Sequence, residues 1–238
     1  PDMALDLLLT DNRVDADLFA RELNSLNFKR KSVGKKLTED AMAAIESEGL
    51  SGDPFILVSG EGWHPGVLGI VASSVMRITG KPSAILTVEE SQAKGSCRSP
   101  PGYDLVRALE HNSDLLEEYG GHEQAAGVTL SADRIRELRE GLIGYTRNEY
   151  PDMVFKPIQE IDVACELSDL SLEELRGLEM MYPTGKGNPV PVVHVKRALV
   201  GECPLVVGKG DHLKFYLEGG DTTMECIWFG MGGMIDRI

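Results

Sequence analysis

The sequence has no apolar run long enough to cross a membrane, and it does not open with the charged-then-apolar pattern of a secretion signal. We therefore expect a cytoplasmic protein with no membrane partner. The first residue is Pro1 rather than Met, which indicates that the chain begins inside a longer gene product or is processed. Apolar residues make up 42% and charged residues 26% of the 238 residues, as in an ordinary globular protein with a sizeable core.

Cysteine is scarce, and its four copies are far apart. No Cys-x-x-Cys pair occurs, which excludes the usual zinc ribbon and thioredoxin-like motifs. Without a secretion signal, free thiols in a reducing cytoplasm are the simplest interpretation. The four residues are Cys97, Cys165, Cys203 and Cys226.

The sequence signatures of several catalytic classes are also missing. There is no Asp-His-His string, no Walker phosphate loop and no Gly-x-Ser-x-Gly elbow. Two-metal phosphoryl chemistry needs several Asp or His ligands in close sets, whereas the acids of this chain are dispersed along predicted helices. We therefore predict no metal site and no cofactor within this chain.

The net charge is -14, which argues against a protein that coats nucleic acid nonspecifically. A local basic groove on an acidic body is still possible. Five cations gather within residues 29–36, and we interpret them as a solvated helix face. A looser group comprises Lys94, Arg98 and Arg107.

The first fifty residues read as a helical connector. Leucines at helical spacing predict one helix around residues 5–9 and another around residues 18–26. Asp15 or Asp17 can begin the second helix, and Asn24, Asn27 and the basic residues near position 30 end it. Thr38 opens a third, alanine-rich helix, which Gly49 stops.

Residues 51–152 predict an α/β domain. Short apolar runs at 55–58 and 84–88 fit buried strands, and an apolar stripe between them fits a helix over 65–78. A strand, a helix and a strand at this spacing form a βαβ unit, whose two strands pair in parallel. Further strands are expected at 94–99 and 126–130, and further helices at 103–111 and 132–145.

Residues 153–238 are strand-rich after Pro151 and Pro157. Strands are expected at 158–165, 190–200, 212–217 and 224–228, with one helix at 172–178 that Ser171 caps. Short strands between Gly, Asp and Pro predict a small OB-like barrel or a sandwich. The sequence stops before a five-stranded barrel can close, so we expect an incomplete one.

Two glycine-containing segments carry the candidate binding residues. Residues 94–99 place Lys94, Arg98 and Ser99 beside a glycine, and arginine can bind phosphate through two parallel hydrogen bonds. A surface ion pair at an exposed strand end explains this pattern equally well. The segments lie about two dozen residues apart with a helix between them, so they could converge on one site.

The second segment spans residues 120–127. Gly120 and Gly121 precede His122, and small residues follow. We interpret this as a turn that exposes the imidazole, which could donate to a phosphate oxygen or stabilise a leaving group in a supporting catalytic role. The alternative is a turn histidine without a role.

A third candidate is His64, which follows a predicted strand and precedes a helix. Helix N-terminal amides there suit an anion, although the simpler interpretation is that His64 caps the helix and Trp63 packs beneath it. In the last domain, Lys214 lies among cations and aromatic residues, a mixture by which small barrels stack single-stranded bases. By strand alternation, at least half of these aromatic residues must be core.

These motifs together resemble the RecJ family of DHH phosphoesterases over essentially the whole chain. The segments GEGWHPGVLGIVASSV, KGSCRS and YGGHEQAAGVTL resemble the DHH-associated domain in order and spacing, and YPTGKGNPVPVVHV with GDHLKFYL resembles the start of the RecJ OB domain. The Gly-Gly-His segment alone is shared by many DHH phosphoesterases.

The resemblance implies a single-stranded-DNA-specific 5′-to-3′ exonuclease that acts in DNA repair and recombination. The family's metal-binding domain, with Mn²⁺ or Mg²⁺, does not occur in this sequence, so the chain would be the substrate-binding portion and inactive alone. Arg98, Ser99 and His122 would hold phosphates of a single strand opposite the metals. The implied partners are single-stranded DNA and the DHH domain of the same protein.

Two other functions stay open. The negative charge and the missing metal motifs fit a stand-alone nucleic-acid-binding or interaction module without nuclease activity. A DHH phosphodiesterase that cleaves short oligonucleotides or cyclic dinucleotides would share the Gly-Gly-His segment. The barrel-like segment argues against this last possibility, because those relatives lack it.

Overall fold

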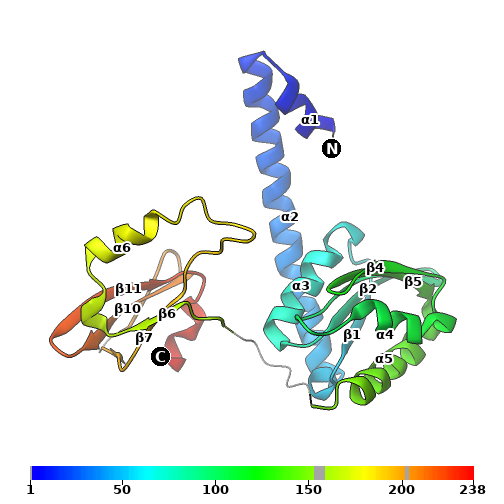
Figure 1. Cartoon of the computed structure of the whole chain (residues 1–238). Helices are drawn as coiled ribbons and strands as arrows, with labels where there is room; N and C mark the ends of the chain where they lie inside the picture. Colours follow the sequence, from blue (N-terminus) through cyan, green and yellow to red (C-terminus); the bar gives the residue numbers. More distant parts are fainter. Residues whose placement is uncertain (1, 153–158, 202–203) are drawn as a thin grey trace. The chain divides into compact units, whose positions relative to one another are not determined.

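The computed structural model describes residues 2–152, 159–201 and 204–238, and the chain divides into two compact units. The N-terminal unit comprises residues 1–158, and the C-terminal unit comprises residues 159–238 (Figure 1). The division into connector, α/β domain and barrel at residues 51 and 153 stays a prediction. No described helix is both long enough and apolar enough to span a bilayer.

The N-terminal unit contains a long helix, a mixed sheet and shorter helices. Its α-helices are α1 (Asp2–Leu9), α2 (Arg13–Ser47), α3 (Leu68–Thr79), α4 (Leu105–His111) and α5 (Ile135–Glu149). Its strands are β1 (Ile56–Glu61), β2 (Ser83–Glu89), β3 (Gln92–Arg98), β4 (Glu118–His122) and β5 (Ala125–Ser131). Short 3₁₀ helices occur at Leu50–Gly52, Pro65–Val67, Ser113–Leu115 and Ala132–Arg134.

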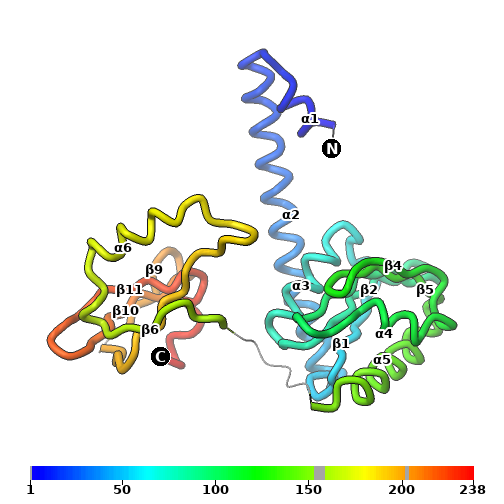
Figure 2. The backbone as a smooth tube through the Cα atoms, in the orientation of Figure 1, coloured from blue at the N-terminus to red at the C-terminus, as the bar shows by residue number. Residues whose placement is uncertain are grey.

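Helix α2 is continuous where the sequence predicted two helices. Asn12 caps its start, because its side-chain oxygen accepts from the amide of Val14. The basic residues do not end it, since arginine and lysine are good helix formers, and Asn27 accepts a hydrogen bond from Arg30 instead of ending the helix. The predicted stop at Gly49 is confirmed by its left-handed conformation, with φ of 71°. In Figure 2, the N-terminal part of α2 extends away from the sheet.

The predicted βαβ unit is confirmed. β1 and β2 pair in parallel, with Ile56 opposite Ser83 and Val58 opposite Ile85. The other neighbours in the five-stranded sheet are antiparallel, and the strand order is β1-β2-β3-β5-β4. The predicted strands at 94–99 and 126–130 are confirmed as β3 and β5, whereas β4 is an additional strand.

Helices cover both faces of this sheet (Figure 1). On one face, α2 and α3 pack on β1 and β2 through Leu37, Ala41, Val71 and their neighbours. On the other face, α4 and α5 pack on Leu57, Leu86 and the inward residues of β3 and β5. The N-terminal unit is therefore a three-layer α/β sandwich. Because α3 contacts β2 and β3, the polar side chains of β3 emerge beside this helix.

The C-terminal unit is built from short strands. It contains β6 (Val163–Cys165), β7 (Val193–Val195), β8 (Leu199–Val200), β9 (Leu205–Val207), β10 (His212–Gly219) and β11 (Thr222–Trp228). Its helices are α6 (Leu172–Glu179) and 3₁₀ segments at Leu167–Asp169 and Gly232–Arg237. Ser171 caps α6 as predicted, in a reciprocal arrangement with Glu174.

The strands of the C-terminal unit form two separate sheets. β10 pairs with β11, β8 and β9, while β6 pairs in parallel with β7. Among the described residues, these sheets do not close into a barrel. The mixed α/β class and the strand-rich second part agree with the sequence-based expectation. The start of the strand predicted at 158–165 lies outside the described residues.

Candidate functional site

The strand register places the two candidate cationic side chains on one face of the sheet. Arg98 of β3 lies opposite Ala125 of β5, and Ala125 lies opposite His122 of β4. Residues in one cross-strand row point to the same face, which here is the face that carries α3. Neighbouring strands are about 4.8 Å apart, so the methyl group of Ala125 is the only side chain between the guanidinium and the imidazole stems.

The row next to this pair carries only small side chains, and the row after it is polar. Ser96, Gly127 and Gly120 form the next row, and Lys94, Thr129 and Glu118 form the one after it. A hollow is lined by Lys94, Gly120, Gly127, Thr129 and their neighbours. Two glycines in its floor allow a ligand to approach the backbone closely. The site therefore has a flat floor between polar walls on β3 and β4.

Arg98 is held in place while part of its guanidinium stays available. Its Nη1 donates to the hydroxyl of Ser96 at 2.9 Å and to the carbonyl of Cys97 at 2.7 Å. Within the described part of the chain, Nε and Nη2 have no hydrogen-bond acceptor and the side chain forms no ion pair. A pre-oriented arginine with unused donors suits a phosphate or carboxylate.

Gly69 of α3 lies directly against this guanidinium. A methyl group at position 69 would come within 2.9 Å of Nη2 of Arg98 and within 3.3 Å of the hydroxyl of Ser96. The lack of a side chain therefore keeps space for Arg98 beside the helix. Neither Gly69 nor Ser96 was a sequence-based candidate. Strand alternation could have found Ser96, because it lies two residues before Arg98.

Ser99 differs from the expectation that it binds substrate. Its side chain is buried, and its hydroxyl lies 2.9 Å from the carbonyl oxygens of both Tyr103 and Glu123. The hydroxyl hydrogen is thus used internally, between the chain after β3 and the turn after β4. Ser99 fixes the position of that turn relative to Arg98, and we now treat it as a positioning residue.

The Gly-Gly-His segment is a strand rather than the predicted turn. Gly120, Gly121 and His122 belong to β4, and the turn to β5 is formed by Glu123 and Gln124. Glycine at position 121 is required, because φ is 151° and an added methyl group would overlap the backbone of Ala125 and Ala126. Gly120 has no atom within 4 Å of such a methyl group. The two glycines therefore have different roles.

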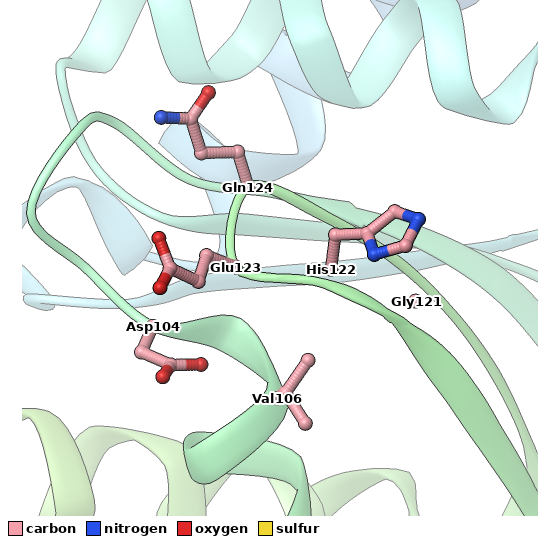
Figure 3. A pocket seen from close by; sticks show the side chains of 6 residues that line it. All are labelled: Asp104, Val106, Gly121, His122, Glu123 and Gln124. Carbon is pink, nitrogen blue, oxygen red and sulfur yellow. The ribbon is translucent and has the colours of Figure 1, made fainter.

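His122 is exposed and lies at the edge of a second hollow (Figure 3). This hollow is also lined by Asp104 and Glu123, and Figure 3 shows the imidazole pointing away from both carboxylates. The acidic side of the turn is unfavourable for an anion. The polar face with Arg98 is consequently the better place for a phosphate.

His64 adopts the capping arrangement that sequence reasoning had favoured for it. Its Nδ1 accepts a hydrogen bond from the amide of Gly66 at 3.0 Å, at the start of the turn that leads into α3. The ring of Trp63 covers Gly60 of β1, where a methyl group would overlap it. The imidazole is exposed. Because its Nδ1 accepts this hydrogen bond, Nε2 is the ring nitrogen that remains for a ligand.

Lys214 belongs to the C-terminal unit and is ion-paired. Its Nζ lies 2.6 Å from Oε1 of Glu225, which also accepts a hydrogen bond from Tyr216 at 2.9 Å. The hydrogen bond raises the pKa of Lys214 and lowers that of Glu225. Its charge is partly neutralised, which weakens Lys214 as a phosphate ligand.

The thiol of Cys97 is unsuited to nucleophilic catalysis. The side chain is fully buried beneath β3, and this burial raises its pKa to about 12. Among the described residues, no group of three or more His, Cys, Asp or Glu side chains is arranged to hold a metal ion.

Comparison with known proteins identifies the domains of the chain. The DHHA1 domain model matches residues 52–148, and the RecJ OB domain model matches residues 161–238. The chain is 33% identical to the single-stranded-DNA-specific exonuclease RecJ of Bacillus subtilis over 239 residues, covering 100% of this chain and 30% of that protein. The chain belongs to the RecJ family.

Further RecJ proteins show the same partial overlap. RecJ of Thermus thermophilus is 32% identical over 91% of this chain and 30% of its own length. The crystal structure of that protein with Mg²⁺ superposes with a TM-score of 0.73, covering 95% of this chain and 34% of the RecJ chain, and a second crystal structure contains Mn²⁺. The chain therefore spans about 30% of the length of these curated RecJ relatives.

Proposed function

We propose that this chain is the part of a RecJ-type exonuclease that holds single-stranded DNA, and that Arg98 and His122 bind one phosphate of the strand. The supporting observation is the cross-strand row in which both side chains flank Ala125 on the same face. In the adjoining row, Gly120 and Gly127 leave space for the sugar-phosphate backbone of the DNA close to the sheet.

Each residue has a distinct part in this proposal. Arg98 supplies the charge and two unused donor atoms, Ser96 and Gly69 fix the direction of the guanidinium, and His122 donates from the opposite strand. Lys94 extends the cationic wall along β3. Ser99 keeps the β4–β5 turn in register, and His64 and Lys214 are secondary contacts at most, since each already has a partner.

Hydrolysis is assigned to the DHH domain that the family resemblance implies. RecJ of Thermus thermophilus has been crystallised with Mg²⁺ and with Mn²⁺, and a divalent ion can activate water for attack on a phosphodiester. The described residues of this chain do not fit such an ion. We therefore expect the 238-residue chain to bind single-stranded DNA without degrading it when Mn²⁺ is added; release of nucleotides by pure protein would contradict this division of roles.

The test of the binding role is an anisotropy titration with a labelled single strand. Arg98→Ala removes charge-assisted hydrogen bonds, each worth about 1.5–3 kcal/mol, so we expect roughly a ten- to hundredfold rise in Kd. Arg136→Ala is the matched control, because Arg136 is exposed on α5 and pairs only with Glu140. If both variants bind as wild type does, Arg98 is not part of the DNA site.

A further inference from the structure

A second cationic surface lies on α2, outside the site just described. Residues 29–36 hold five lysine and arginine residues and no acid, in a chain whose net charge is -14. None of these five side chains forms an ion pair within the described ranges. The one side-chain partner is the amide oxygen of Asn27, which accepts from Arg30.

Part of this cluster lines a groove between α2 and α3. The α2 wall carries Arg30, Lys31 and Lys35, and the α3 wall carries Ile70 and Ser74. No residue that lines the groove has a carboxylate. Gly34 also lines the groove and is buried, and a methyl group at this position would have no atom within 4 Å. The groove therefore combines three cations, the hydroxyls of Thr38 and Ser74, and an apolar contact.

The groove adjoins the Arg98 site across a single turn of α3. Gly69 lies against the guanidinium of Arg98, and the next residue, Ile70, lines the groove. A helix is about 10 Å wide with its side chains, so the width of α3 separates the Arg98 site from the groove. A flexible polyanion bound at one place can reach the other.

We propose that the α2–α3 groove is a second phosphate-binding place, which takes the sugar-phosphate backbone of the same single strand a few nucleotides from the Arg98 site. The inference rests on the proposed DNA-binding function. Lys31 and Lys35 neutralise backbone phosphates as point charges. Arg30 adds its Nη1 donors, since its Nε and Nη2 donate to Asn27, and Ile70 contacts a sugar or a base. The groove reads no sequence, because backbone contacts carry no base information.

The helix itself offers a matched control. Lys31 and Lys35 lie on the side of α2 that faces the groove, whereas Lys29 and Lys36 are exposed and do not line it. The double variant Lys31→Ala/Lys35→Ala and the double variant Lys29→Ala/Lys36→Ala remove equal charge from the same helix. They therefore separate groove binding from the general attraction of a basic helix.

The experiment compares two ligands, a phosphorylated dinucleotide and a single strand of about 15 nucleotides. For Lys31→Ala/Lys35→Ala we expect the long strand to bind three- to tenfold more weakly, and the slope of log K against log salt to fall by about 1.4, the value for two phosphates at about 0.7 each. The dinucleotide should bind as it does to wild type. Lys29→Ala/Lys36→Ala should change neither ligand by more than about twofold.

Three results would overturn the inference. The first is an unchanged affinity of Lys31→Ala/Lys35→Ala for the long strand. The second is an equal loss of affinity in both double variants, and the third is an equal loss of affinity for the dinucleotide and the long strand. If the long strand binds Lys31→Ala/Lys35→Ala as it binds wild type while Arg98→Ala is still weakened, the proposed function stands and only the groove is excluded from the DNA site. If neither Arg98→Ala nor Lys31→Ala/Lys35→Ala affects binding, both the proposed function and this inference fail.

Discussion

The two units of the chain differ in how much apolar surface they bury. In the N-terminal unit both faces of the sheet are covered, and residues such as Phe55, Leu86 and Leu142 are almost completely inaccessible. In the described part of the C-terminal unit, the buried hydrophobic residues are Leu167 and Leu213, while Met180 is 86% exposed and Phe229 is 72% exposed. The same chain thus holds one densely packed unit and one that is thinly packed.

This difference bears on the proposed phosphate site. A site made from a guanidinium and an imidazole on separate strands needs a fixed register, and the core that packs against the α4–α5 face of β3 and β5 provides it. A unit that buries few side chains opens locally at low cost. We therefore expect the N-terminal unit to be the more stable of the two.

The largest expected effect is on unfolding of the two units. Each unit has one tryptophan, Trp63 or Trp228, so Trp228→Phe and Trp63→Phe backgrounds report on the units separately. Leu142→Ala should lower the free energy of unfolding seen by Trp63 by about 2–5 kcal/mol, because a buried leucine leaves a cavity. The midpoint seen by Trp228 should not move.

Leu213→Ala is the reciprocal variant, and it should shift the Trp228 transition alone. Fluorescence during urea unfolding measures both. A single transition that both tryptophans follow, and that both variants shift together, would show that the two units unfold as one body.

A smaller effect separates the two glycines of β4. Gly121→Ala should destabilise the N-terminal unit by about 1–3 kcal/mol, because alanine is strained in that backbone region and its methyl group overlaps β5. Gly120→Ala should leave stability within about 0.5 kcal/mol, which is typical of a substitution without a clash, yet weaken DNA binding several-fold by filling the floor of the site. Thermal melting and anisotropy on both variants test this; equal stability of the two variants would refute the assigned roles.

The smallest effect concerns the ion pair on β10 and β11. Because Lys214 lowers the pKa of Glu225, the pair stabilises the C-terminal unit above the usual pKa of glutamate, 4.5, and the contribution is lost as the pH falls through the lowered value. The raised pKa of Lys214 keeps the contribution until the pH rises above 10.5. The melting temperature of Glu225→Gln, followed through Trp228, should therefore be slightly lower than that of wild type at pH 7, and the difference should shrink as the pH falls below 4.5. A difference in melting temperature that does not change with pH would exclude this ion pair as its cause.

The sequence predicted elements well where apolar runs and turn residues are distinct. The parallel β1–β2 pair, α3, α4, α5 and the cap of α6 follow from buried runs, helical spacing and Ser171. The prediction was wrong at the paired glycines, because glycine occurs both in turns and in strands where backbones approach closely. Gly120 and Gly121 resemble a turn, but they lie in β4 because partners on β5 satisfy their backbone. The continuity of α2 was missed because its favourable packing through Leu37 and Ile45 is tertiary.

The site itself shows the same limit. Motifs located Arg98 and His122, but only the β3–β5–β4 register places them in one row. Ser99 sits next to Arg98 and therefore points to the opposite face, where its hydroxyl bonds to the turn. The roles of Ser96 and Gly69 depend on contacts between residues distant in sequence, which a single sequence does not specify.

A crystal structure of this chain with a short single-stranded oligonucleotide would test the phosphate site most directly. We expect a phosphate over the Gly120 and Gly127 floor, within hydrogen-bond distance of the guanidinium of Arg98 and the imidazole of His122. A strand bound on the α4 side of the sheet, or one whose phosphates contact neither side chain, would contradict it.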